Sequence, residues 1–196
     1  MSISAAAPTL TQAPYWYLTR STGIVAFVLM TVALAFGIAA TQRALATPAW
    51  PRFATQNLHR NVSLLGLGFL VVHIVTTILD GFVTISWWNV VIPFLSDYRR
   101  LWVALGTISF DLILAVIISS LVRLRMNAKL WRQLHLTVYV MWPLTFLHFL
   151  YTGTDTAHGR FGVWVAIISA GFVGLAIAVR FTMGSDEPQP IKSIVR

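Results

Sequence analysis

Residues 59–79, HRNVSLLGLGFLVVHIVTTIL, form an apolar stretch long enough to cross a lipid bilayer as one α-helix. The stretch carries two histidines, His59 and His73, which are fourteen residues apart. At about 100° per residue, this spacing brings the second histidine to within about 40° of the first, so both lie on one face of the predicted helix. An ionisable side chain inside a membrane span is costly and therefore indicates a functional site.

The composition of the whole chain also indicates a membrane protein. Of its 196 residues, 57% are hydrophobic and only 10% are charged, and the mean hydropathy is +0.76. Apolar segments of roughly 20 residues recur along the chain. They run approximately over residues 22–41, 59–79, 101–122, 133–152 and 161–179. The sequence therefore predicts an all-α membrane protein, a five-helix transmembrane bundle.

The positive charges lie between the apolar segments and predict the orientation of the bundle. On a small soluble domain the net charge of +8 would suggest nucleic acid binding, but here the charges report membrane topology. Cytoplasmic loops are enriched in Lys and Arg, so we expect the N-terminus outside and the C-terminus in the cytoplasm. The larger set of basic residues, on the expected inner side, is Arg43, Arg52, Arg60, Arg123, Arg125, Lys129, Arg132, Arg180, Lys192 and Arg196. The smaller set is Arg20, Arg99, Arg100 and Arg160.

A second pair of histidines, His135 and His148, lies in the fourth apolar segment. The second and fourth segments run in the same direction, so His59 is level with His135 near the cytoplasmic face, and His73 is level with His148 nearer the outer face. The two levels are roughly 20 Å apart along the helices. Neutral imidazole is a good iron ligand, and the absence of cysteine excludes iron–sulfur clusters and the attachment of c-type haem. We therefore expect two b-type haems, with His59 and His135 on the inner iron and His73 and His148 on the outer iron.

The second pair of histidines requires an irregular helix. In a straight helix, thirteen residues leave His148 about 140° from His135, too far around to face the same partner. Pro143 lies between them and can kink the helix. We expect a proline kink or a π-bulge near Met141–Pro143 that turns His148 back toward the partner helix.

The H-x13-H spacing on one helix and the H-x12-H spacing two helices later resemble the ferric reductase-like transmembrane domain. NADPH oxidases, ferric reductases and a bacterial haem-binding subunit of periplasmic methionine sulfoxide repair share this domain. The resemblance covers roughly residues 17–155, and four short phrases are similar to an actinobacterial branch of the family. These are Trp16–Arg20, Tyr98–Trp102, Trp131–His135 and Gly153–Asp155. Members commonly have six helices, and we expect this sequence to lack the first.

The resemblance implies a multi-pass protein of the bacterial cytoplasmic membrane that transfers electrons, as a subunit of an oxidoreductase rather than a complete enzyme. Nothing after Val179 could fold as an FAD or NADPH module. We therefore expect a separate flavin or NAD(P)H reductase, or menaquinol, as donor. Expected acceptors are an extracytoplasmic flavoprotein, a ferric chelate or a quinone. Three alternatives stay open: a quinol-coupled haem anchor of a periplasmic reductase, a transporter for haem or a metal ion, and a purely structural membrane protein.

Four arginines are candidate partners of haem propionates. Arg60 and Arg132 stand beside the inner ligands, where they could pair with propionates or simply mark the cytoplasmic side. Arg99 and Arg100 could serve the outer haem in the same way.

Several smaller side chains also have two possible roles. Hydroxyls about one turn from the ligands could orient an imidazole or bond back to their own helix. They are Ser63, Thr76 and Thr145. Asp111, within the third segment, could relay protons or be protonated and hydrogen-bonded. Gly66, Gly68 and Gly106 would admit a flat macrocycle or allow close helix packing.

We expect one transmembrane haem-binding domain over residues 16–182, between a mobile N-terminal segment, residues 1–15, and a polar cytoplasmic tail, residues 183–196. A sixth apolar run, residues 83–95, is too short to cross the membrane and contains Asn89 and Pro93. It is expected to be an interfacial or re-entrant loop, with Trp87 and Trp88 as headgroup-level anchors.

Overall fold

The computed structural model describes residues 13–41, 52–81, 83–159 and 161–183, and its regular structure in these ranges is entirely helical. Five spans are long and apolar enough to cross a membrane, which confirms the predicted fold class. The long helices are α1 (Ala13–Ala40), α2 (Arg52–Leu79), α4 (Arg100–Leu121), the joined pair α5 (Ala128–Leu136) and α6 (Val138–Thr152), and α7 (Phe161–Met183). Shorter helices are α3 (Trp87–Val91) and the 3₁₀ turns η1 (Arg123–Arg125) and η2 (Thr154–Gly159).

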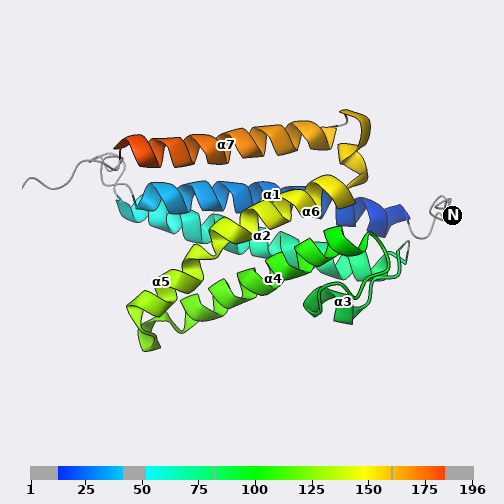
Figure 1. Ribbon diagram of the computed structural model, residues 1–196, viewed down its shortest axis with the longest axis horizontal. Coiled ribbons are helices and arrows are strands. Elements are labelled where there is room, and N and C mark those ends of the chain that lie inside the picture. The colour runs from blue at the N-terminus through cyan, green and yellow to red at the C-terminus, as the bar shows by residue number, and fades with distance from the viewer. Residues whose placement is uncertain (1–12, 42–51, 82, 160, 184–196) are drawn as a thin grey trace, which may run out of the picture.

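The expected N-terminal segment and tail lie largely outside these described ranges. Helix α1 begins at Ala13, so it includes the last three residues of the expected N-terminal segment. Figure 1 shows that the first turn of α1 and the last turn of α7 lie at opposite ends of the bundle. Five crossings, an odd number, place the start and the end of the bundle at opposite ends. This arrangement agrees with termini on opposite sides of a membrane.

Helix α1 is the centre of the bundle, because it packs along α2 on one side and contacts α6 and α7 on others (Figure 1). Its buried surface includes small residues, Ala26, Ala33 and Ala35, which allow neighbouring helices to approach closely. A buried cluster of Leu34, Ile38 and Val173 joins α1 to α7. Large apolar side chains elsewhere point outward, as expected of helices that face lipid.

The fourth span is broken, but not where the sequence predicted. We expected an irregularity near Met141–Pro143, whereas α5 ends at Leu136 and α6 begins at Val138, with Thr137 between them. The Thr137 and Val140 amides each donate to a carbonyl three residues back, to Leu134 and to Thr137, so the chain tightens there. Pro143 lies inside α6. The predicted position was wrong because proline need not break the helix at its own residue: its ring crowds the preceding turn.

The short apolar run forms α3 and stays on one side of the bundle against α4. The residue that caps its N-terminus, Ser86, donates through both its amide and its hydroxyl to the Asn89 side chain, 2.7 Å each. The Thr107 hydroxyl of α4 donates to the Asn89 carbonyl at 2.8 Å. Trp87 and Trp88 remain more than half exposed, as the predicted anchoring role requires.

Candidate haem-binding site

His59 and His73 both lie on the face of α2 that packs against α1. Each ring has its Nδ1 atom 2.8 Å from a backbone carbonyl of α1, that of Ala33 for His59 and that of Thr19 for His73. A carbonyl only accepts hydrogen bonds, so Nδ1 carries the proton and Nε2 keeps its lone pair. This tautomer is the one that binds a metal through Nε2, and a hydrogen bond to the other nitrogen is the usual support of a metal-bound histidine.

The inner pair, His59 and His135, has the spacing of two ligands on one ion. The centres of the two rings are 6.3 Å apart, with the ring planes at 69°. A metal–imidazole bond is about 2 Å long and the ring centre lies about 1 Å beyond the nitrogen, so two imidazoles on opposite sides of one ion have centres about 6 Å apart. The separation is therefore compatible with one metal ion held between the two imidazoles.

The outer pair, His73 and His148, lines a cavity of about 270 Å³. His148 points into the bundle from α6, the helix that follows the break at Thr137, and its Nδ1 lies 2.8 Å from the Trp102 carbonyl of α4. His148 thus presents Nε2 in the same tautomer as His73. The cavity wall is mostly apolar, which suits a flat macrocycle held between helices.

Three glycines make room for these rings, and sequence reasoning missed two of them. A Cβ atom placed on Gly23 would lie 2.8 Å from Nδ1 of His73, and one on Gly106 would lie 2.5 Å from Nδ1 of His148. At Gly37 the nearest ring atom, Cε1 of His59, would be 3.3 Å away. Gly23 and Gly37 are fourteen residues apart, the same spacing as His59 and His73, and this match was the available signal.

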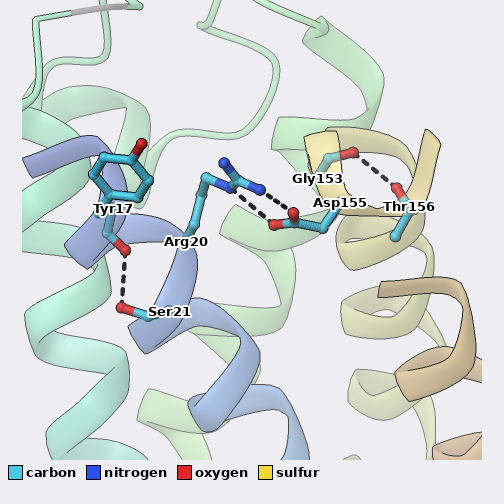
Figure 2. Close-up of polar contacts among 6 residues, drawn as sticks. All are labelled: Tyr17, Arg20, Ser21, Gly153, Asp155 and Thr156. Carbon is cyan, nitrogen blue, oxygen red and sulfur yellow. Dashed lines mark hydrogen bonds and ion pairs between the residues drawn. The ribbon is translucent and has the colours of Figure 1, made fainter. Parts of the chain in front are cut away.

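The cation that lines the outer cavity is Arg20 of α1. Its Nε atom donates to Oδ2 of Asp155 at 2.8 Å and its terminal nitrogen donates to Oδ1, so η2 is tied to α1 by two residues that both line the cavity (Figure 2). Its guanidinium also lies 3.9 Å from the centre of the Trp16 ring. This arginine was counted in the sequence only as a topology marker.

The four predicted arginines are all exposed. Arg99 donates to the Tyr151 carbonyl and Arg100 donates to the Phe94 carbonyl at 2.6 Å, and neither lines the outer cavity. Arg60 lies next to His59 on α2, and Arg132 lies one turn before His135 on α5. The structure thus brings Arg20, rather than Arg99 or Arg100, to the outer histidines.

The family described as the ferric reductase like transmembrane component matches residues 22–146, more than half of the chain. The chain belongs to the ferric reductase-like transmembrane family. The searches of curated proteins and of solved structures returned no match. The matched range contains His59, His73 and His135 and ends two residues before His148.

Membership makes this chain a multi-pass membrane protein of a family whose membrane domains generally bind haem and transfer electrons across the bilayer. Among the residues that the structure describes, no three His, Cys, Asp or Glu side chains gather as a metal-binding group.

The hydroxyls near the ligands donate to backbone carbonyls of their own helices, which is one of the two roles expected of them. Ser63 donates to the His59 carbonyl at 2.7 Å, Thr76 to the Val72 carbonyl at 2.8 Å and Thr145 to the Met141 carbonyl at 3.0 Å. These hydroxyls therefore do not hold the imidazoles.

The other glycine and acid candidates also lie apart from the ligands. Gly66 packs against α1 beside Leu29, and Gly68 has no neighbour near its Cβ position. Asp111 is half-buried in α4 and is not among the residues that line the outer cavity.

Asp80 is a further cavity residue that sequence reasoning missed. It follows the last residue of α2, is only 4% exposed, and its Oδ1 atom has no hydrogen-bond partner within the described part of the chain. Burial raises the pKa of this carboxyl above its usual range, because the charged form loses its hydration.

We predict that Asp80→Asn stabilises the protein at neutral pH. The folded-state pKa exceeds the unfolded value, so the native state binds more protons and loses stability as pH rises from the unfolded pKa through the folded one. Thermal unfolding in one detergent should give a higher Tm for the variant at pH 7, with the two proteins converging toward pH 4. Asp97→Asn, at an exposed loop position, is the control and should change the Tm little at pH 7. An equal shift of Asp80→Asn at every pH would contradict this account.

Proposed function

We propose that this chain carries electrons across the bacterial cytoplasmic membrane through two b-type haems. His59 and His135 would ligate the inner iron, and His73 and His148 the outer iron. The observation that carries the proposal is the pairing of four histidines at two levels of one bundle, with the inner rings 6.3 Å apart and the outer rings on one cavity.

Two ligands per level favour haem over a bare metal ion. A small ion held by protein alone needs several ligands that converge on one point, as a transporter site would. No such group of three or more is found over the described ranges. A porphyrin supplies four nitrogens itself and asks the protein for two axial ligands, which is what each level offers.

Within this proposal, haem supplies an iron that changes between the ferric and ferrous states. The chain positions the ligands: α1 carbonyls hold His59 and His73, and an α4 carbonyl holds His148. The fourteen residues between His59 and His73 separate the levels by about 20 Å along α2.

The proposed function needs one partner that donates electrons and another that accepts them. A cytoplasmic flavin or NAD(P)H reductase, or menaquinol, would feed the inner haem, and the outer haem would reduce an extracytoplasmic flavoprotein, ferric chelate or quinone. Arg60 and Arg132 lie beside the inner ligands and would face the inner propionates. Arg20, which lines the outer cavity, is better placed than Arg99 or Arg100 to face the outer propionates.

The proposal is tested by the haem content of the purified full chain. We expect about two b-type haems per chain and a reduced-minus-oxidised spectrum typical of two histidine ligands on each iron. The variant with all four histidines replaced by alanine should be colourless, whereas His158→Ala, which alters the fifth histidine, should keep full haem content. Stoichiometric zinc without a Soret band would support the transporter instead and end the proposal.

A further inference from the structure

Three of the four haem-facing histidines contact the same local arrangement on a neighbouring helix. In each case Nδ1 lies 2.8 Å from the carbonyl of a residue i, and a glycine occupies position i+4 of that helix. We call this arrangement a carbonyl–glycine pair. The three pairs are Thr19 with Gly23 for His73, Ala33 with Gly37 for His59, and Trp102 with Gly106 for His148.

The glycine is required by helix geometry. The carbonyl of residue i accepts the amide of residue i+4, so any side chain at i+4 begins beside that carbonyl. A Cβ at Gly106 would lie 2.5 Å from Nδ1 and 2.6 Å from Cε1 of His148, closer than carbon and ring atoms approach in folded proteins. The imidazole could escape only by moving away from the carbonyl. Glycine therefore lets a helical carbonyl accept a second hydrogen bond from the side.

His135 differs from the other three histidines. Its Nδ1 atom is buried and finds no acceptor among the residues that the structure describes. Its ring instead stacks on Trp131, one turn earlier on α5, with ring centres 5.1 Å apart. Stacking on a flat neighbour restrains the ring plane but does not select the tautomer. At the inner level, a hydrogen bond therefore fixes the His59 ring, whereas the His135 ring is less restrained.

We propose that the carbonyl–glycine pairs are positioning elements for the haem ligands, and that the inner centre exchanges His135 for an added neutral ligand such as carbon monoxide. This inference rests on the proposed two-haem function. His73 and His148, each with such a pair, would both stay bound and would leave no position for the added ligand. Carbon monoxide binds ferrous haem only where an axial position opens, so it reports which iron–histidine bond is released.

The physical basis is the basicity of the ligand. A hydrogen bond from Nδ1 to a carbonyl makes Nε2 a stronger donor and holds the ring in the binding orientation. Loss of such a partner typically weakens metal binding by about 10- to 100-fold. The same factor is expected between a histidine that has a carbonyl–glycine pair and one that lacks it.

Carbon monoxide titration of the dithionite-reduced full chain tests the assignment. We expect one of the two haems to form the adduct. Removal of both outer ligands, His73→Ala/His148→Ala, should leave a reactive centre, and removal of both inner ligands, His59→Ala/His135→Ala, should leave an unreactive one. Adduct formation at neither haem, at both haems equally, or at the outer haem alone would overturn the proposal.

Alanine at the glycines tests the positioning role. In the variant without inner ligands, Gly106→Ala should raise the carbon monoxide affinity of the outer centre by about 10- to 100-fold and change its low-spin electron paramagnetic resonance signal. Gly23→Ala should act similarly, because its Cβ would lie 2.8 Å from Nδ1 of His73. Gly171→Ala on α7 is the matched control, since a Cβ there meets nothing within 4 Å.

Gly37→Ala is a milder substitution, and it keeps the test decisive if one of the other glycine variants fails to fold. At Gly37 the added Cβ would meet His59 at 3.3 Å, so the ring needs to shift by only a few tenths of an ångström. Gly37→Ala should fold, retain two haems and increase carbon monoxide binding at the inner centre by a smaller factor. If all three glycine variants match Gly171→Ala in spectrum and ligand binding, the pairs have no positioning role. That result would leave the two-haem function standing, whereas a wild-type protein without haem would refute both.

Discussion

Replacing any one of the four histidines with alanine should lower the haem content of the purified protein from about two to about one per chain. In the proposed assignment each iron would have two protein ligands, one from α2 and one from the α5–α6 span, so removal of either would open its centre. A haem in a site built for two histidines would bind more weakly once one of its two iron–nitrogen bonds is lost. Haem quantification after purification in detergent measures the loss.

The identity of the surviving centre tests the pairing. His59→Ala and His135→Ala should leave the same centre, with the same midpoint potential, and His73→Ala and His148→Ala should leave the other. The ring contact between His59 and His135 is the basis for the inner assignment. If His59→Ala and His148→Ala leave the same centre, the pairing is wrong. Loss of both haems in every variant would mean that the bundle needs both cofactors to fold.

We expect Phe27→Ala to be the most destabilising single change in the region between the two histidine levels. Phe27 is 2% exposed, its ring centre lies 4.7 Å from that of Phe149, and the planes are nearly parallel at 12°. It also contacts the rings of Trp142 and Phe146, each at 6.2 Å. Truncation of a buried phenylalanine leaves a cavity and costs about 3–5 kcal/mol. Packing of this kind holds helices together in lipid, where the hydrophobic effect between them is lost.

The measurement is thermal unfolding of the wild-type protein and the variant in the same detergent. For a chain of this size, the loss should lower the Tm by roughly 10 °C. Phe161→Ala is the control, because that side chain is 66% exposed at the start of α7 and should change the Tm little. Phe27→Leu should recover part of the loss. A Tm for Phe27→Ala equal to that of the control would show that the ring cluster contributes no stability.

Much of the architecture could be predicted from local pattern. Apolar length alone defined the five spans, because a helix must satisfy its backbone within the segment to cross a bilayer. The level of each histidine followed from rise per residue and alternating direction, and these depend only on position along the chain. The pairing of His59 with His135 could be predicted from the sequence for the same reason, and the 6.3 Å separation of the two ring centres agrees with it.

The direction in which His148 points from the fourth helix could not be predicted from the sequence in the same way. The histidine spacing showed that a straight helix would turn His148 away from the partner helix. Pro143 was therefore expected to bend the helix and turn His148 back. The break lies at Thr137 instead, where the backbone adopts a tighter turn between α5 and α6. Proline signals that a helix is disturbed, but the residue that absorbs the disturbance depends on how the neighbouring helices pack.

The sequence by itself thus determined which segments cross the membrane, which histidines share a level, and which family the chain resembles. Only the tertiary structure decided that backbone carbonyls of α1 and α4 hold three of the histidines, and that Gly23 and Gly37 admit their rings. It also decided that Arg20 lines the outer cavity. Spans and levels follow from the period of a single helix, whereas contacts between helices depend on their rotation and separation, which no single segment specifies.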